Sequence, residues 1–434
     1  MFKIKIPIFI WLFGLFALPL LACGVFQGAT ATPKTSVTAT STRLSRTAQA
    51  ARRTFLAMTR AAIQGIFTDT PTPTKTIGPT RTPHETPTPS PTLTPTAEFP
   101  RTDYASIPAP ALANNILGEA PERDLLVYLP ASYAETEKHY PVVYYLLDFG
   151  LRVRDVTLPP ENVTKDVTFG LTKEMILVIV SGANSLGGSL YVNSPITGNW
   201  DDFVSQDVVR YVDAHYRSIP QPASRGISGY TVGGFGALSL AMRHPDVFGA
   251  VYSISPTLFD ENGLAASPMF SVPRTIDAVL DLKARELPLS TTDGVSDMQH
   301  AADAVRFSLA YGTTFAPNPS KPPYMDYPYY RQNGRVFRDE TIWQRWNTGF
   351  GTLTDKVQFY KVNLLKLNNI TLACGDHPPY LWILPGCKYF SAQLTAAGIP
   401  NQVVGFPGGL EPDLEHGIRA FILPFFSEKL FGDQ

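Results

Sequence analysis

Short apolar runs alternate with segments of helical periodicity from residue 101 to the C-terminus, and this alternation restricts the possible folds most. The runs Asp124–Pro130, Pro141–Leu147 and Met175–Gly182 are β-branched or continuously apolar, which is typical of buried parallel strands. Helical patterns follow, from Phe203–Tyr216 to the amphipathic stretch Gly417–Leu430. Strands that alternate with helices predict a three-layer α/β fold with a mainly parallel central sheet.

One part of this region departs from the alternation. Residues of about 257–356 contain many prolines and tyrosines, and we expect a loop-rich insertion there. An insertion after a central strand commonly overhangs the carboxyl edge of the sheet, where ligands bind. Its aromatic side chains either stack on a ligand or pack within the loops; they are Tyr324, Tyr327, Tyr329 and Tyr330.

The N-terminus has the pattern of an export signal. Lys3 and Lys5 precede an apolar run, Ile6–Ala22, which is short for a membrane span and ends at Cys23. The sequence Leu20–Cys23 resembles the lipobox of bacterial lipoproteins, which implies cleavage and acylation of the cysteine. Residues 1–23 are therefore expected to be a lipoprotein signal peptide, and the protein an exported cell-surface lipoprotein anchored to the membrane. The alternative is an uncleaved signal anchor.

Residues 24–100 are rich in threonine and proline and contain few apolar side chains, so we expect a disordered tether. Its prolines favour extended polyproline conformations. Within it, residues 42–67 contain five arginines and no acid. That segment is either a basic helix that lies on anionic lipid or a weakly helical piece of linker.

Charge and cysteine content exclude several classes of function. Thirty-six basic and 37 acidic residues leave a net charge of −1, so binding to nucleic acid through bulk positive charge is not expected. No spacing of His, Cys and carboxylates is typical of a zinc site, and no glycine-rich phosphate loop is present. We therefore expect neither a metal nor a cofactor.

A tight turn with a central hydroxyl lies between a predicted strand and a predicted helix. Its residues run Gly229, Tyr230, Thr231, Val232, Gly233. A small-x-nucleophile-x-small turn of this kind is the nucleophile elbow, in which the central side chain projects over the sheet. The N–H group of the next residue helps to bind the oxyanion of the reaction.

The whole folded part resembles an esterase family of the α/β-hydrolase superfamily that includes formylglutathione hydrolases, feruloyl esterases and mycolyltransferases. The blocks that carry the resemblance include YPVVYYLLDFG, RGISGYTVGGFGALSLAMRHPDVFGAVYSISP and WILPGCKYFSAQLTAAGIP. The resemblance implies an α/β-hydrolase fold, acyl transfer from an ester, and an oxyanion hole formed by the N–H groups of Val232 and Phe149.

The catalytic positions of that family are substituted in this chain. Thr231 stands where the family has its nucleophilic serine, Pro378 where it has its acid, and Leu410 where it has its histidine. In addition, Asp148 places a carboxyl group at the oxyanion loop, where a negative charge has the wrong sign for stabilising an oxyanion. We interpret the chain as a non-catalytic or strongly impaired homologue that binds a small ligand or ester in the former active-site cleft.

An alternative keeps the chemistry with a rearranged triad. In it Thr231 is the nucleophile, His416 the base and Asp376 the orienting acid of an active ester hydrolase or acyltransferase. His377 is a second candidate base. Ser228 matches the literal motif Gly-Ile-Ser, but it lies three residues too early, within the strand, and we interpret it as structural.

Two cysteines remain once Cys23 is assigned to the lipid anchor. Cys374 and Cys387 flank the loop at the position of the family's acid. They form either a disulfide that closes this loop or two buried free thiols.

Overall fold

The computed structural model describes residues 102–159, 163, 172–286, 288, 301–376, 381–406 and 414–432 of the chain. All of them lie within one compact unit, Thr92–Gln434. The predicted signal peptide with Cys23, the tether and the basic segment 42–67 lie outside the described residues. Within the described part, no helix combines the length and the apolar character needed to cross a membrane.

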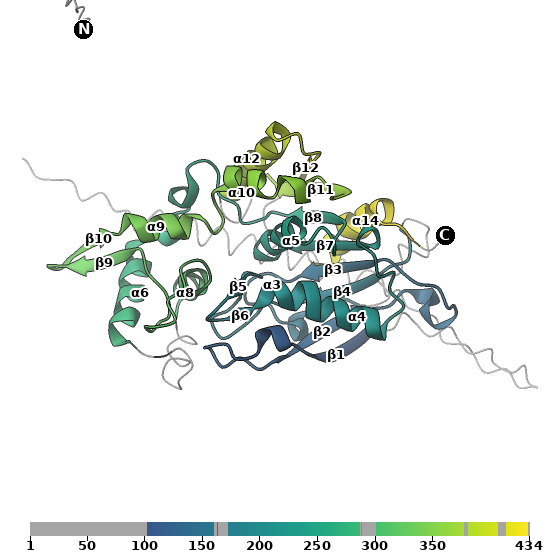
Figure 1. The fold of residues 1–434 in the computed structure, drawn as a ribbon, viewed down its shortest axis with the longest axis horizontal. Coiled ribbons are helices and arrows are strands. Elements are labelled where there is room, and N and C mark those ends of the chain that lie inside the picture. The colour runs from purple at the N-terminus through teal and green to yellow at the C-terminus, as the bar shows by residue number, and fades with distance from the viewer. Residues whose placement is uncertain are drawn as a thin grey trace, which may run out of the picture. The chain divides into compact units, whose positions relative to one another are not determined.

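An eight-stranded sheet forms the centre of the fold (Figure 1). Its order is β1-β2-β4-β3-β7-β8-β11-β12. The strands are β1 (Thr102–Pro108), β2 (Glu122–Tyr128), β3 (Val142–Leu146), β4 (Ile176–Val180), β7 (Arg225–Tyr230), β8 (Ala250–Ile254), β11 (Asn369–Gly375) and β12 (Gln402–Phe406). β2 is antiparallel to both of its neighbours, whereas the pairs from β4 to β12 are parallel. The predicted α/β architecture is confirmed, except that the run at Asp124–Pro130 forms an antiparallel strand.

Both faces of the central strands are buried. Successive side chains of a strand point to opposite sides of the sheet. In β3, Val142, Tyr144 and Leu146 belong to one apolar core. Val143 and Tyr145 belong to the other core. This explains why the central strands are continuously apolar rather than alternating.

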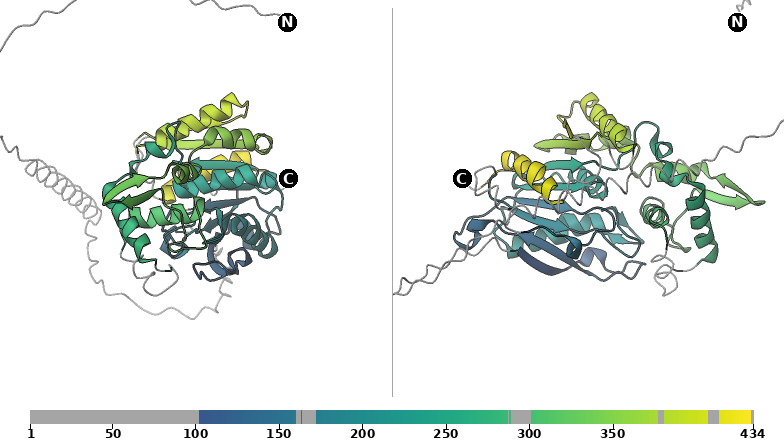
Figure 2. Two further views of the ribbon diagram at one scale, coloured as in Figure 1. Left: turned by 60° about the vertical axis from the view of Figure 1, so that its left-hand side comes forward. Right: turned by 180° about the vertical axis from the view of Figure 1, so that it is seen from behind.

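Helices cover the two faces. One face packs α3 (Trp200–Asp202), the π-helix η4 (Phe203–Val208), α4 (Val209–His215), α5 (Val232–Arg243), α10 (Leu353–Phe359), α11 (Lys361–Leu364) and α12 (Ile383–Ala396). The other face packs α13 (Leu414–Gly417), the π-helix η8 (Ile418–Ile422) and α14 (Leu423–Lys429), seen from behind in Figure 2. The short strands β5 (Asn193–Ser194) and β6 (Gly198–Asn199) pair with each other near α3.

The insertion contains more regular structure than the sequence suggests. It folds into α6 (Pro273–Arg285), α8 (Asp303–Phe315), α9 (Glu340–Asn347) and a hairpin of β9 (Tyr329–Gln332) and β10 (Arg335–Arg338), on the left in Figure 1. The expectation of a loop-rich insertion did not include these helices and strands, which lie between long loops. Its prolines do not interrupt these helices: Pro273 occupies the first turn of α6, and the prolines from 317 to 328 lie between α8 and β9.

The tyrosines of the insertion pack against its own aromatic residues. Tyr327 contacts Trp346, with ring centroids 5.4 Å apart, and Tyr330 stacks on Phe337 at 5.8 Å. None of the four tyrosines lines the cavity described below. Their aromatic contacts match the interpretation of these residues as internal packing.

Candidate functional site

The turn after β7 holds Thr231 in a strained backbone conformation. Its φ of 46° and ψ of −105° are rare for any residue other than glycine and are most costly for a β-branched one. The neighbouring glycines make the turn possible, since a Cβ atom on Gly233 would overlap the carbonyl oxygen of Leu146. The strand, the sharp turn and α5 therefore form the elbow that the sequence predicts.

The Thr231 hydroxyl is buried without a partner. The residue is 4% exposed, and its Oγ1 atom makes no hydrogen bond within the described part of the chain. The backbone of Thr231 does form hydrogen bonds. Its N–H group donates to the Ile254 carbonyl at 2.9 Å, and its carbonyl accepts from the Phe235 N–H group at 2.9 Å. The backbone thus holds the side chain at the elbow and leaves its hydroxyl unsatisfied.

The two N–H groups assigned to the oxyanion hole converge on a single atom. Val232 N–H donates to Asp148 Oδ1 at 3.1 Å, and Phe149 N–H donates to the same oxygen at 2.7 Å. A carboxylate oxygen thus occupies the position in which an oxyanion would accept these bonds. The sequence placed Asp148 near this site, but it did not show that its side chain takes up both donors.

A buried tyrosine supports the loop that carries Asp148. The Tyr191 hydroxyl donates to the carbonyl of Leu147 at 2.7 Å and accepts from Gly182 N–H at 3.0 Å. Burial raises the pKa of Tyr191 well above its usual value, so this hydroxyl remains a donor. Gly236 on α5 lets the Tyr191 ring pack closely, since a Cβ atom there would lie 2.6 Å from that ring.

A cavity of about 920 Å³ opens beside the elbow. Asp148, Phe149, Thr231 and Thr257 reach it from the carboxyl ends of the parallel strands, and the insertion closes it from the other side. Most of the other side chains that line it are apolar: Val232, Met269, Val272, Phe307, Leu381 and Trp382. The insertion therefore overhangs the carboxyl edge of the sheet, as predicted.

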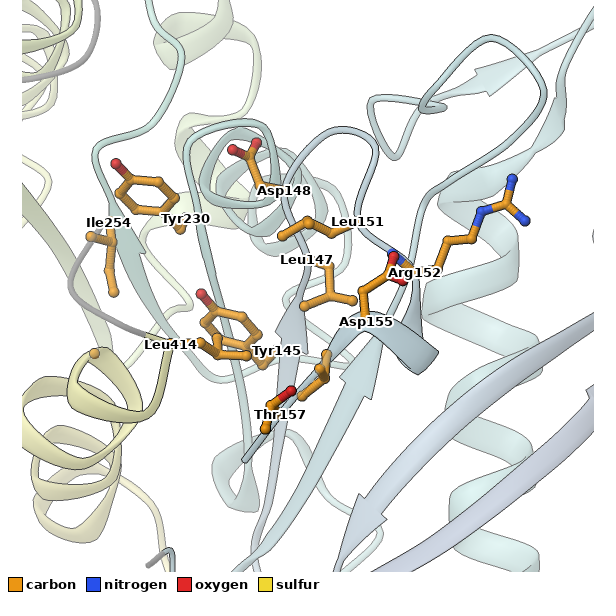
Figure 3. A pocket seen from close by; sticks show the side chains of 12 residues that line it. Tyr145, Leu147, Asp148, Leu151, Arg152, Asp155, Thr157, Tyr230, Ile254 and Leu414 are labelled. Carbon is orange, nitrogen blue, oxygen red and sulfur yellow. The ribbon is translucent and has the colours of Figure 1, made fainter. Parts of the chain in front are cut away.

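A second cavity, of about 260 Å³, shares Asp148 with the first. Figure 3 shows Asp148 between Tyr230 and Leu151, with Leu414 across the cavity. Asp148 therefore lines both cavities, and its loop contributes to the walls of each.

The residues of the rearranged triad do not line the cavity with Thr231. His416 is exposed on α13, with its ring against Phe421 at a centroid distance of 5.7 Å. Asp376 is exposed after β11, and its N–H group donates to the Phe406 carbonyl at 3.1 Å. His377, Pro378 and Leu410 lie outside the described residues.

The other candidates from the sequence have structural contacts. Ser228 is fully buried within β7, and its hydroxyl donates to the Tyr252 carbonyl at 2.6 Å. Cys374 and Cys387 form a disulfide that joins β11 to α12. In the described residues, no group of three or more His, Cys, Asp or Glu side chains is arranged to hold a metal ion.

Sequence reasoning missed three polar residues of the cavity: Thr257, and Asp303 and Arg306 of α8. Thr257 follows β8. Its position just beyond the carboxyl end of a strand could have identified it as a cavity residue, because ligands bind at that edge of a parallel sheet. Arg306 lies on α8 of the insertion, and nothing in the local pattern of that helix indicates that it reaches the cavity.

Comparison with known proteins gives partial similarities. The chain is 28% identical over 134 residues to Esterase Rv1288 and to Esterase MT1326 of two strains of Mycobacterium tuberculosis. This match covers 30% of the present chain and 28% of each relative, so the chain spans little more than a quarter of the length of those proteins.

Among solved structures, a ferulic acid esterase is similar with a TM-score of 0.48 and 19% identity, covering 76% of this chain and 99% of that one. An S-formylglutathione hydrolase from Agrobacterium tumefaciens has a TM-score of 0.43 and 14% identity, covering 77% and 98%.

The family model described as "Putative esterase" matches residues 120–270. This segment includes β2, β3, β4, β7, α5 and β8, and therefore the elbow and the Asp148 loop. Residues 120–270 therefore resemble this esterase family, and they lie in a mainly parallel α/β sheet.

Proposed function

We propose that this protein is an exported, membrane-anchored member of the esterase family that binds a small ligand in the former active-site cleft and does not turn it over. The N-terminal pattern that ends at Cys23 supports export and anchoring. The cavity of about 920 Å³ at the elbow supports the binding of a ligand.

One observation supports the proposed loss of activity most directly: the Asp148 carboxylate accepts hydrogen bonds from the N–H groups of both Val232 and Phe149. In acyl transfer these groups stabilise the negative oxygen of the tetrahedral intermediate, and removal of one donor typically costs about 100- to 1,000-fold in rate. Here both donors are already engaged, and the carboxylate repels a second negative charge. A substrate carbonyl would therefore find neither its donors nor a favourable potential.

The nucleophile position supports the same proposal. A threonine hydroxyl needs a base within about 3.2 Å to become nucleophilic. Thr231 Oγ1 has no hydrogen-bond partner in the described part of the chain, and the His416 ring contacts Phe421 instead.

The alternative function is ester hydrolysis or acyl transfer through Thr231, with His416 and Asp376. The strained backbone of Thr231 favours it, because such strain is concentrated at functional sites. For this function, the Asp148 loop and the segment that carries His416 would both have to move when substrate binds.

Ester turnover separates the two functions. We expect the wild type and Thr231→Ser to hydrolyse p-nitrophenyl acetate no faster than buffer, because a better nucleophile does not supply the missing oxyanion donors. Thr231→Val removes the hydroxyl and keeps the side-chain volume, and Ser228→Ala removes a hydroxyl three residues away as the matched control. Turnover by the wild type that Thr231→Val abolishes and Ser228→Ala preserves would establish the active alternative.

A further inference from the structure

The cavity contains a cation that the fold leaves without a hydrogen bond. Arg306 on α8 lines the cavity, and no hydrogen bond from its guanidinium to any described residue is formed. Its Nε atom is buried and unpartnered. The Arg306 side chain is 30% exposed. An arginine carries five N–H donors in a planar fork that matches carboxylate geometry, so its guanidinium is available to an acceptor in the cavity.

Among the described residues, Asp303 is the acid within ion-pair distance of Arg306, and it does not replace that acceptor. Asp303 Oδ1 lies 3.9 Å from Arg306 Nη1, at the limit of an ion pair, and its side chain is fully exposed, with a relative accessibility of 101%. Solvent screens an exposed pair of this kind, so the attraction between the two groups is weak. The Asp303 carboxylate is therefore a weak competitor for the guanidinium.

Aromatic rings lie beside the guanidinium. A Cβ atom on Gly187 would lie 2.6 Å from the Phe149 ring and 3.3 Å from Arg306 Nη2, so these two side chains approach the same point. Phe149 in turn packs edge to face on Phe307, with ring centroids 5.0 Å apart. The cation thus lies next to an apolar wall on which the body of an organic ligand would pack.

The negative charge of Asp148 at the elbow orients the ligand. Asp148 occupies the oxyanion position next to Thr231, so an anionic group is repelled from that end of the cavity. The hydroxyl groups of Thr231 and Thr257 are 4% and 3% exposed, line the same cavity and have no hydrogen-bond partner among the described residues. They fit a neutral polar group, whereas Arg306 fits an anion.

From this arrangement we infer that the cavity binds a small organic carboxylate with an apolar body. The carboxylate accepts two hydrogen bonds from Arg306, and the body packs on Phe149 and Phe307. A monoanion fits better than a phosphate, because Arg306 is the one cationic side chain that lines the cavity in the described structure and the acids Asp148 and Asp303 line it too. This inference rests on the proposed function, in that the cavity binds a ligand without turnover.

The test compares two probes of the same shape, naphthalene-2-carboxylate and its neutral alcohol, naphthalen-2-ylmethanol. Binding is measured by calorimetry and by the fluorescence of Trp382, which lines the cavity. We expect the wild type to bind the acid at least about 10-fold tighter than the alcohol, which corresponds to about 1.4 kcal/mol.

Variants at the two ends of the ion pair are expected to have opposite effects. Arg306→Gln keeps a polar side chain and removes the charge, so it lowers acid affinity about 10-fold and leaves alcohol affinity unchanged. Asp303→Asn removes the competing carboxylate and raises acid affinity a few-fold. Unfolding curves of both variants that match the wild type show that the fold is intact.

The possible outcomes separate this inference from the proposed function. Equal affinity for acid and alcohol, unchanged in Arg306→Gln, overturns the preference for a carboxylate and leaves a neutral ligand site. Failure of both probes to bind overturns the inference and the ligand-binding function together. Turnover of the ethyl ester of the same acid overturns the proposed loss of activity, whatever the affinities of the probes.

Discussion

At the residue scale, Lys356 on α10 places its amine among apolar side chains, which include Phe235. Its Nζ atom donates to the carbonyl of Gly349 and lies 5.9 Å from the Phe235 ring centroid. Within the described residues, no carboxylate forms an ion pair with it. Burial, and secondarily the cation of Arg243, lowers the pKa of Lys356 from its ordinary value of 10.5 to about 7.

This shift predicts a pH-dependent cost to stability. The folded chain releases the Lys356 proton near pH 7, whereas the unfolded chain keeps it up to about pH 10.5. Between these values the unfolded state binds more protons, so the unfolding free energy rises with pH. Lys356→Met should therefore stabilise the protein relative to the wild type by on the order of 1–3 kcal/mol at or below pH 7, and this gain should shrink towards pH 10.

Denaturant unfolding at several pH values measures this effect, with Lys366→Met at an exposed position as the control. A Lys356→Met effect of the same size at every pH would contradict the prediction. The buried tyrosines that titrate at high pH are common to both proteins, so their contribution cancels in the difference.

At the scale of elements, β3, β7 and α5 form the unit that positions the site. β7 ends at Tyr230 and α5 begins at Val232, so a single residue makes the turn. Gly233 permits the contact of α5 with β3, because the carbonyl oxygen of Leu146 fills the space where a Cβ atom would lie. Asp148 lies in the loop that follows β3, two residues after Leu146. The contact between Gly233 and Leu146 therefore sets the distance between the Asp148 carboxylate and the N–H group of Val232.

Gly233→Ala tests this unit. The added methyl group meets backbone atoms that cannot rotate away, so we expect the unfolding free energy to fall by about 2 kcal/mol or more. Gly405→Ala in β12 is the matched control, because its Cβ atom would meet nothing within 4 Å. We expect the control to change stability by less than about 0.5 kcal/mol. Equal effects of the two substitutions in urea unfolding would show that the close contact is not required.

At the scale of the whole molecule, sequence periodicity predicted the architecture better than it predicted the site. The central strands are apolar on both faces and the helices between them are periodic, so local patterns contain the information for the three layers. The edge strand β1 was missed, because its residues are mostly polar and partly exposed. The helices of the insertion were missed because its prolines concealed apolar positions at helical spacing, such as Ile276, Val279 and Leu280 on α6.

The site combines residues that are far apart in the chain. Thr231, Val232 and Phe149 were identifiable from motifs, because the elbow and the oxyanion loop each have a local signature. Arg306 reaches the cavity only through the packing of α8, 75 positions after Thr231 in the sequence. The occupation of both oxyanion donors by Asp148 depends on a side-chain conformation, which sequence periodicity does not report.

The disulfide links the stability of the whole fold to the predicted export. Cys374 and Cys387 are separated by 13 positions, and their bond joins the sheet to α12 across the loop that leads to Leu381 and Trp382 of the cavity wall. Closing a loop of this size stabilises a fold by about 3 kcal/mol in the chain-entropy model, and such bonds persist in oxidising compartments. We expect Cys374→Ala/Cys387→Ala, and the wild type in reductant, to unfold at clearly lower denaturant concentration than the oxidised wild type. Coincident unfolding curves of the oxidised and reduced wild type would show that the bond is not formed or does not contribute, and a chain that is stable without it would not require an oxidising compartment.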